Sequence, residues 1–179
     1  MLTNEETATW IYKMHKYIFE EQSILTIVLK GHLIMENHLE NLLDTILVDP
    51  SVLNYEKMYL MQKINLLAAM GVFTKKDIKA YQRFNKIRNN FAHDIDYEIT
   101  SSDLDAIINS FTPKLVLIRE EMTSYGSESV SKLQSIIFSL IVLLILQNSE
   151  DKESGKKPHH LIEVSDIERL IQYGKDAQR

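Results

Sequence analysis

The stretch TKKDIKAYQRFNKIRNNFAHD, residues 74–94, decides the fold of this chain. It opens with Thr74 and Asp77, a capping box in which each side chain satisfies a free backbone amide of the first helical turn. Behind the cap, apolar side chains recur every three or four residues, which predicts an amphipathic helix over about residues 74–93. Such a helix must bury its apolar face against other helices. The apolar positions are Ile78, Tyr81, Phe84, Ile87 and Phe91.

Helical periodicity continues on both sides of this stretch, and no pair of strands is convincing. The sequence therefore predicts an all-α helical bundle of about six to seven helices. The other predicted helices span about residues 4–21, 23–48, 54–70, 102–122, 127–148 and 161–174.

The few Gly, Pro and hydroxyl residues mark where these helices begin and end. Gly71 supplies a left-handed position after the helix over 54–70. Pro50 ends the helix over 23–48, because the residue before a proline disfavours helical geometry. Pro113 removes a backbone donor, so it kinks or splits the helix over 102–122. The cap of that helix is Thr100, Ser101 or Ser102.

The domain organisation follows from a change in composition near residue 150. Residues 1–149 form the predicted bundle domain, and residues 150–160 are a polar linker that contains Gly and Pro. Residues 161–179 hold a short C-terminal helix.

Composition limits the possible functions. The chain has 179 residues, a net charge of −5 and no cysteine, which excludes disulfides, Cys-ligated zinc and thiol catalysis. An acidic chain binds DNA poorly without specificity, so any nucleic-acid contact needs a local basic patch. No signal peptide is visible, and the longest apolar run, Ile136–Leu146, is too short to span a membrane. We therefore expect a cytoplasmic protein without a membrane contact.

The end of the helix over 74–93 carries the strongest chemistry. Arg88 offers a guanidinium fork that fits a phosphate, and His93 offers an imidazole that moves protons near neutral pH. In an ideal helix these two side chains point about 140° apart, so they meet only if the helix unwinds or a second subunit completes the site. Arg88 falls on the apolar side, where it needs an anionic partner. The partners available on the helix over 23–48 are Glu36 and Glu40.

A row of cations follows the opposite side of the same helix and ends at His93. This row is a candidate RNA-binding face, and the alternative interpretation is a solvated helix surface. The row consists of Lys75, Lys76, Lys79, Arg83 and Lys86, and the candidates for RNA binding among them are Lys75, Lys79, Arg83 and Lys86.

The order of helices, Gly71-Val72-Phe73 and the string IRNNFAHD, residues 87–94, resemble the HEPN superfamily, in which an Arg precedes a His by four to six residues. Within it, the chain is most similar to the mannitol operon repressor group, over about residues 22–122. The resemblance implies a homodimer whose two motifs face one cleft, and metal-independent cleavage of RNA through attack of the 2′-OH on the adjacent phosphate. Such a protein acts in stress or phage defence and can have a protein antitoxin as its partner.

The resemblance also implies roles for individual residues. His93 would be the general acid or base, and Arg88 would stabilise the charge of the transition state. Asn89 and Asn90 would bind the phosphate or brace His93, and Asp94 would support the site. No cofactor is expected. One departure is Ile95, which stands where many toxin-type members have Tyr; the nearest tyrosine is Tyr97.

Other interpretations stay open. The Arg and His can be a buried ion-pair partner and a polar helix end, and the chain can be a regulator of the mannitol operon repressor type that acts through protein partners. It can also be a structural dimerisation module. A metal site is weaker, since ligands on one helix do not make a site. The side chains that suggest it are His32, Glu36, His38 and Glu40.

Overall fold

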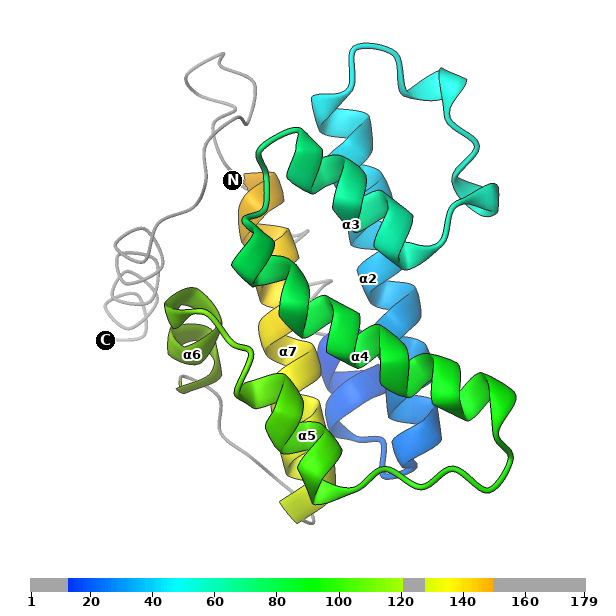
Figure 1. The fold of residues 1–179 in the computed structure, drawn as a ribbon, viewed down its shortest axis with the longest axis vertical. Helices are drawn as coiled ribbons and strands as arrows, with labels where there is room; N and C mark the ends of the chain where they lie inside the picture. Colours follow the sequence, from blue (N-terminus) through cyan, green and yellow to red (C-terminus); the bar gives the residue numbers. More distant parts are fainter. Residues whose placement is uncertain (1–12, 121–127, 150–179) are drawn as a thin grey trace.

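The computed structural model describes residues 13–120 and 128–149. Over these residues the chain is all-α and contains no strand, which confirms the predicted fold class. Figure 1 shows α2 and α7 standing side by side in the centre, with α4 crossing in front of them and α3, α5 and α6 around the edge. The helices are α2 (Ile24–Ile46), α3 (Leu60–Ala69), α4 (Lys75–His93), α5 (Ser101–Ile108), α6 (Pro113–Glu120) and α7 (Glu128–Ser149).

The centre of the core is the long contact between α2 and α7. The apolar run predicted as a buried helix lies in α7, where Ile136, Ile137 and Leu140 are fully buried. Gly31 of α2 faces Ile137 directly, because a Cβ atom on Gly31 would lie 2.8 Å from the Cγ2 atom of Ile137. The absence of a side chain at Gly31 thus lets the two central helices approach closely.

The beginning of α4 is fixed as the sequence predicts. Thr74 caps the helix: its hydroxyl accepts from the Asp77 amide at 3.2 Å, while the Asp77 carboxylate accepts from the Thr74 amide at 3.0 Å. Asp77 is buried, and it also accepts from the Thr112 hydroxyl at 3.0 Å and lies 3.9 Å from the Lys114 ammonium. One carboxylate therefore ties the start of α4 to the start of α6.

The middle of α4 is held against the core by aromatic side chains. Tyr81 is fully buried, and its hydroxyl donates to the Leu140 carbonyl of α7 at 2.8 Å. Burial raises the pKa of Tyr81, so this donor keeps its proton. The C-terminal turns of α4 then reach the surface beside α2 (Figure 1).

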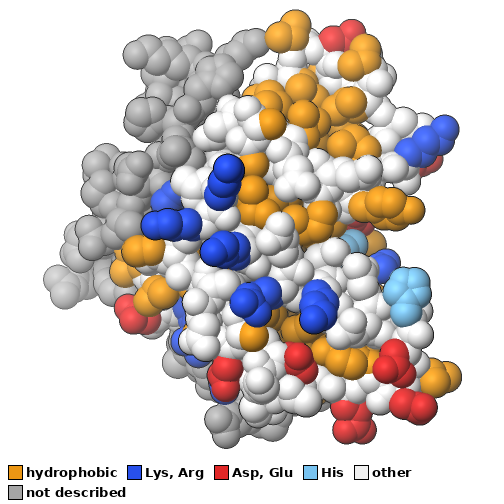
Figure 2. Space-filling model, in the orientation of Figure 1, with side chains coloured by type: hydrophobic (Ala, Val, Ile, Leu, Met, Phe, Trp, Pro, Cys, Tyr) orange, Lys and Arg blue, Asp and Glu red, His pale blue; other side chains and the backbone are white. Residues whose placement is uncertain are grey.

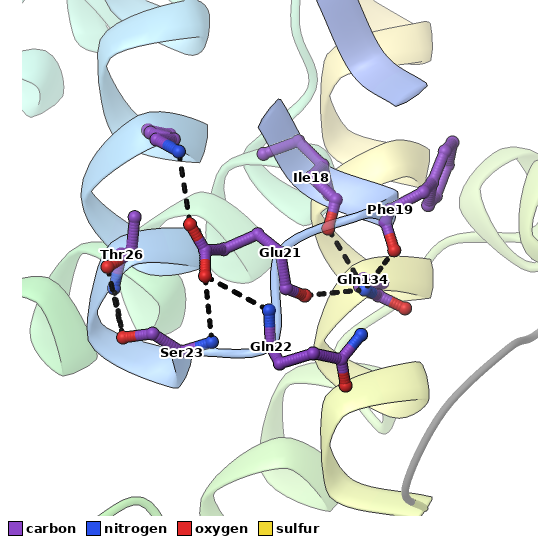
Figure 3. A network of polar contacts seen from close by, with 8 residues as sticks. Ile18, Phe19, Glu21, Gln22, Ser23, Thr26 and Gln134 are labelled. Atoms are coloured by element: carbon purple, nitrogen blue, oxygen red, sulfur yellow. Dashed lines mark hydrogen bonds and ion pairs between the residues drawn. The ribbon is translucent and has the colours of Figure 1, made fainter. Parts of the chain in front are cut away.

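A buried amide anchors the turn that precedes α2. The Gln134 side chain of α7 donates to the carbonyls of Ile18, Phe19 and Glu21, at 2.9, 3.2 and 3.2 Å. Figure 3 shows these three carbonyls converging on the one amide, which closes the short π-helix η1 (His15–Phe19) against α7. Ser23 then caps α2 by accepting from the Thr26 amide at 3.3 Å.

One predicted boundary is wrong. The helix expected over 54–70 begins only at Leu60, after two 3-10 turns, η2 (Pro50–Val52) and η3 (Tyr55–Lys57). The Tyr55 hydroxyl donates to Asp44 of α2 at 2.7 Å, which holds this segment as a loop along α2. Met58 and Met61 have helical spacing in the sequence, but no helical turn connects them in the structure.

The remaining boundaries agree with the predictions where they are described. The expected helix over 102–122 is split, with α6 beginning at Pro113, and Thr100 is the cap of α5. Gly71 has the positive φ of 85° expected after α3. The polar linker, residues 150–160, and the C-terminal helix, residues 161–179, lie outside the described residues, as does the beginning of the helix expected over 4–21.

In the described part of the chain, α7 is long and apolar enough by length and composition to cross a membrane, over Ser129–Gln147. However, 67% of this segment is buried inside the protein, in its contacts with the other helices of the bundle.

Candidate active site at the end of α4

The helix that carries the motif does not unwind. Helix α4 is continuous to His93, and the Asp94 amide closes its last turn by donating to the Asn90 carbonyl at 2.9 Å. Five residues along an unbroken α-helix turn through about 500°, so Arg88 and His93 point about 140° apart. Arg88 is half-buried on the side that meets α2, and His93 is exposed. The structure therefore excludes the route in which the helix unwinds to bring these side chains together.

The Arg88 guanidinium has few partners. One terminal nitrogen lies 3.5 Å from the Asn89 side-chain oxygen, a long contact, and the buried Nε atom has no hydrogen-bond partner in the described part of the chain. Among the same residues Arg88 also forms no ion pair. Since a guanidinium carries five donors, most of its capacity to bind an anion is unused.

The expected pairing of Arg88 with Glu36 or Glu40 is wrong. Both carboxylates are paired with Lys63 of α3, whose Nζ atom lies 2.5 Å from an oxygen of Glu40 and 3.5 Å from one of Glu36. The Lys63 side chain is almost fully buried, and a buried ammonium must be paired. Lys63 therefore takes the carboxylates that the sequence assigns to Arg88.

His32 completes this group of polar side chains, which we call the α2–α3–α4 cluster: His32, Glu36, Glu40, Lys63 and Arg88. The His32 ring is buried, and its Nδ1 atom lies 3.7 Å from Glu36. Burial lowers the pKa of His32, the Glu36 carboxylate opposes this effect, and the charges of Arg88 and Lys63 lower the pKa further. Burial thus disfavours the charged form of His32, which weakens its competition with Arg88 for an anion.

Sequence reasoning missed both Lys63 and the closeness of His32 to Arg88. Lys63 had a visible signal, because it stands three residues after Leu60 and four before Leu67 on the apolar face of α3. A charge on such a face requires a buried partner. His32 was considered only as a metal ligand, and in the described ranges no three His or acidic side chains gather as metal ligands.

The remaining motif residues surround the exit of α4. Asn89 and Asp94 are exposed, and Asn90 is half-buried beside Tyr97. Tyr97 packs edge-on against Phe91, with ring centroids 4.8 Å apart, and burial raises the pKa of its hydroxyl. The hydroxyl lies near Asn90 but makes no hydrogen bond to a described residue.

Ile95 does not take the place of this tyrosine. Its side chain is 98% exposed, in the loop that follows α4. The tyrosine near the motif is thus Tyr97, four residues after His93 instead of two, and it is packed into the protein on Phe91.

The cationic row is a continuous feature of the surface. Figure 2 shows Lys and Arg side chains gathered in a diagonal band over α4 on the face in view. The row is exposed along its whole length, and His93 lies on the same side of the helix at its end. Its members are Lys75, Lys76, Lys79, Arg83 and Lys86.

A row of exposed leucines lies on α2, close to the cluster. Leu25, Leu29 and Leu33 are 44%, 41% and 64% exposed, and their spacing of four residues places them along one side of the helix. Glu36, seven residues after Leu29, lies within about 20° of that side. The leucine row therefore continues directly into the residues that surround Arg88.

Searches against models of protein families, curated proteins and solved structures found no match to this chain.

Proposed function

We propose that this chain is a metal-independent endoribonuclease of the HEPN type that acts in the cytoplasm as a homodimer. The observation that carries the proposal is the state of Arg88, a half-buried guanidinium that no carboxylate of the described residues neutralises. A cation in this state has a strong preference for an anionic ligand. The phosphate of RNA is such a ligand, and the cationic row along α4 leads to the same end of the helix.

The proposed reaction needs two functions from the protein. His93 moves protons, either from the attacking 2′-OH or to the departing 5′-oxygen. Arg88 stabilises the additional negative charge on the phosphate, and Asn89 and Asn90 donate to its oxygens or brace His93. The bond from the 2′-oxygen to phosphorus forms as the bond to the 5′-oxygen breaks. The products are a 2′,3′-cyclic phosphate and a 5′-hydroxyl.

The geometry of α4 supports the proposed second copy. Because α4 is unbroken, one chain holds Arg88 and His93 on different sides of the helix, whereas the proposed reaction needs both at one phosphate. The leucine row beside the cluster gives a second copy an apolar surface to cover. A twofold dimer that buries Leu25, Leu29 and Leu33 would bring two motifs into one region and shield them from water.

A second candidate function uses the same surface. A regulator of the mannitol operon repressor type, which acts through protein partners, would use the exposed leucine row as its docking surface. In that case Arg88 and His93 would be dispensable for function, whereas Leu29 and Leu33 would be essential. The mass of the purified wild-type protein and of a variant with a charge in the leucine row separates the two functions. A wild-type dimer that becomes a monomer in the variant indicates that the row is the dimer interface. An unchanged mass leaves the row free to bind another protein.

The deciding experiment is cleavage of a mixed RNA pool in EDTA by the wild type and by the His93→Ala and Arg88→Gln variants. We expect cyclic-phosphate ends from the wild type, and a loss of at least about a hundredfold in rate for each variant. Gln82→Ala, an exposed change on the same helix, is the matched control and should cleave normally. Full activity in the His93→Ala variant would contradict the proposed role, and cleavage by no form would favour the regulator.

A further inference from the structure

The α2–α3–α4 cluster contains more cationic and anionic groups than the motif uses. Its two carboxylates, Glu36 and Glu40, come from α2, and its two cations, Lys63 and Arg88, come from α3 and α4. The charges balance, yet the pairing is uneven, since Lys63 contacts both carboxylates and Arg88 contacts neither.

This uneven pairing is set by burial. The Lys63 side chain is 3% exposed, so its ammonium gains most from carboxylates that have lost part of their water. Glu36 and Glu40 are more open, with side chains 25% and 34% exposed. Arg88 is half-buried and keeps some contact with solvent, and so it loses the competition for the carboxylates.

Glu36 and Arg88 both act on His32. The His32 ring is 3.7 Å from Glu36, and the charge of Arg88 lowers the pKa of the same ring. Opposite charges attract, so a Glu36 carboxylate released by Lys63 would compete for Arg88.

We propose that Lys63 is a positioning residue, which holds Glu36 and Glu40 away from Arg88 and so leaves the guanidinium open to a phosphate oxygen. The inference rests on the proposed function, because it names how that site is kept ready for its anion. In this inference a buried lysine of α3, which lies outside the motif, controls whether the motif binds phosphate.

The test is a titration of the wild type with inorganic phosphate, observed by NMR at the Arg88 Nε–H group. We expect the wild-type signal to shift and saturate. In Lys63→Met the released Glu36 should pair with Arg88 and weaken phosphate binding by about tenfold or more. In the triple variant Lys63→Met/Glu36→Gln/Glu40→Gln both released carboxylates are gone, so binding should return to within about threefold of the wild type. A merely structural role of Lys63 would not give this rescue.

Several outcomes would overturn the inference. These are no phosphate binding at Arg88 in the wild type, normal binding in Lys63→Met, or no recovery in the triple variant. If Lys63→Met does not fold, phosphate binding is measured in Glu36→Gln with Lys63 in place. The inference requires an affinity within about threefold of the wild type, because Lys63 already holds Glu36 away from Arg88, and binding about tenfold tighter or more would refute it.

The phosphate titration also separates this inference from the proposed function. Lys63-dependent phosphate binding without RNA cleavage would leave the inference standing and remove the ribonuclease. RNA cleavage at equal rates in the wild type and Lys63→Met would support the ribonuclease and contradict the role of Lys63.

Discussion

Gly31 and Ile137 meet at the crossing of the two central helices, where a Cβ atom on Gly31 would lie 2.8 Å from Cγ2 and 2.9 Å from Cδ1 of Ile137. Ile137 is fully buried and branched at Cβ, so its side chain has little freedom to move aside. The closest approach of α2 and α7 therefore depends on one missing methyl group.

Gly31→Ala should destabilise the protein despite the higher helix propensity of alanine. The propensity gain is about 1 kcal/mol, and overpacking a core costs about 1–3 kcal/mol, so the free energy of unfolding should fall by roughly 1 kcal/mol. Urea unfolding measures this change, with exposed Asn37→Ala on α2 as the control. In the double variant Gly31→Ala/Ile137→Ala the cost should be less than the sum of the two single costs. Strict additivity would show that the two residues do not clash.

Replacing Gln134 should also lower the free energy of unfolding. Leucine at this position would leave the carbonyls of Ile18, Phe19 and Glu21 without their donor, at a cost of about 1–3 kcal/mol. Gln134→Glu should cost more at pH 7, where an ionised carboxylate faces three carbonyl oxygens, and less at pH 4, where its proton restores a donor. Thermal unfolding at both pH values tests this, with exposed Gln82→Glu as the control. An equal loss at both pH values would contradict the assigned contact.

The fold was largely readable from the sequence, because helices with one apolar face leave a strong periodic signal. The capping box at Thr74 and the split at Pro113 also depend on nearby residues alone, and both were predicted. The loop at 50–59 was missed because its conformation depends on Tyr55 reaching Asp44, eleven residues earlier. Contacts between helices of this kind leave no periodic trace.

The site was less predictable for the same reason. The positions of the motif residues on α4 and the exposure of the cationic row follow from one helix, and the structure shows that helix and that exposure. Which cation pairs with Glu36 and Glu40 depends on the relative depth of Lys63 and Arg88, set by the packing of α3 against α2. The sequence identified the half-buried arginine that needs an anion but not the lysine that pairs with Glu36 and Glu40.

His38 should make the protein sensitive to acid. Burial, with a smaller contribution from Lys13, lowers the pKa of His38 to about 4, from about 6.5 in an unfolded chain. The unfolded state therefore takes up a proton before the folded state does. The stabilisation from the neutral ring is complete above pH 6.5 and is lost as the pH falls towards 4, by roughly 3 kcal/mol.

The test for His38 compares how the free energy of unfolding of the wild type and of His38→Gln depends on pH. We expect a flatter dependence in the variant between pH 6.5 and 4, although His32, also buried, keeps part of the slope. Asn41→Ala, an exposed change on the same helix, should keep the full slope. Parallel curves for wild type and His38→Gln would show that His38 is not held neutral.

The cationic row makes a prediction about salt. If Lys79, Arg83 and Lys86 each contact an RNA phosphate, replacing one by Ala should weaken binding of a single-stranded RNA without regard to its sequence. The slope of log affinity against log salt should become shallower by about 0.7 for each lost contact. Fluorescence anisotropy gives this slope, and Lys57→Ala, an exposed change on η3, is the control. An unchanged slope would make the row a solvated helix face.

The division of Arg88 and His93 between two chains can be tested by mixing inactive proteins. In Arg88→Gln the imidazole remains, and in His93→Ala the guanidinium remains, so a mixed dimer contains one intact pair if each site takes one residue from each chain. Random mixing of equal amounts makes half of the dimers mixed, each with one of two sites intact, so about a quarter of the wild-type activity should return.

The mixing experiment has its own controls. Native mass spectrometry measures the fraction of mixed dimers, and either variant alone should stay inactive. Leu29→Lys, on the leucine row that we propose as the interface, should give a monomer and prevent recovery when it is added to both variants. If mixed dimers form and no activity returns, Arg88 and His93 do not act across the interface. The unbroken α4 would then require a substrate long enough to reach both sides of one helix.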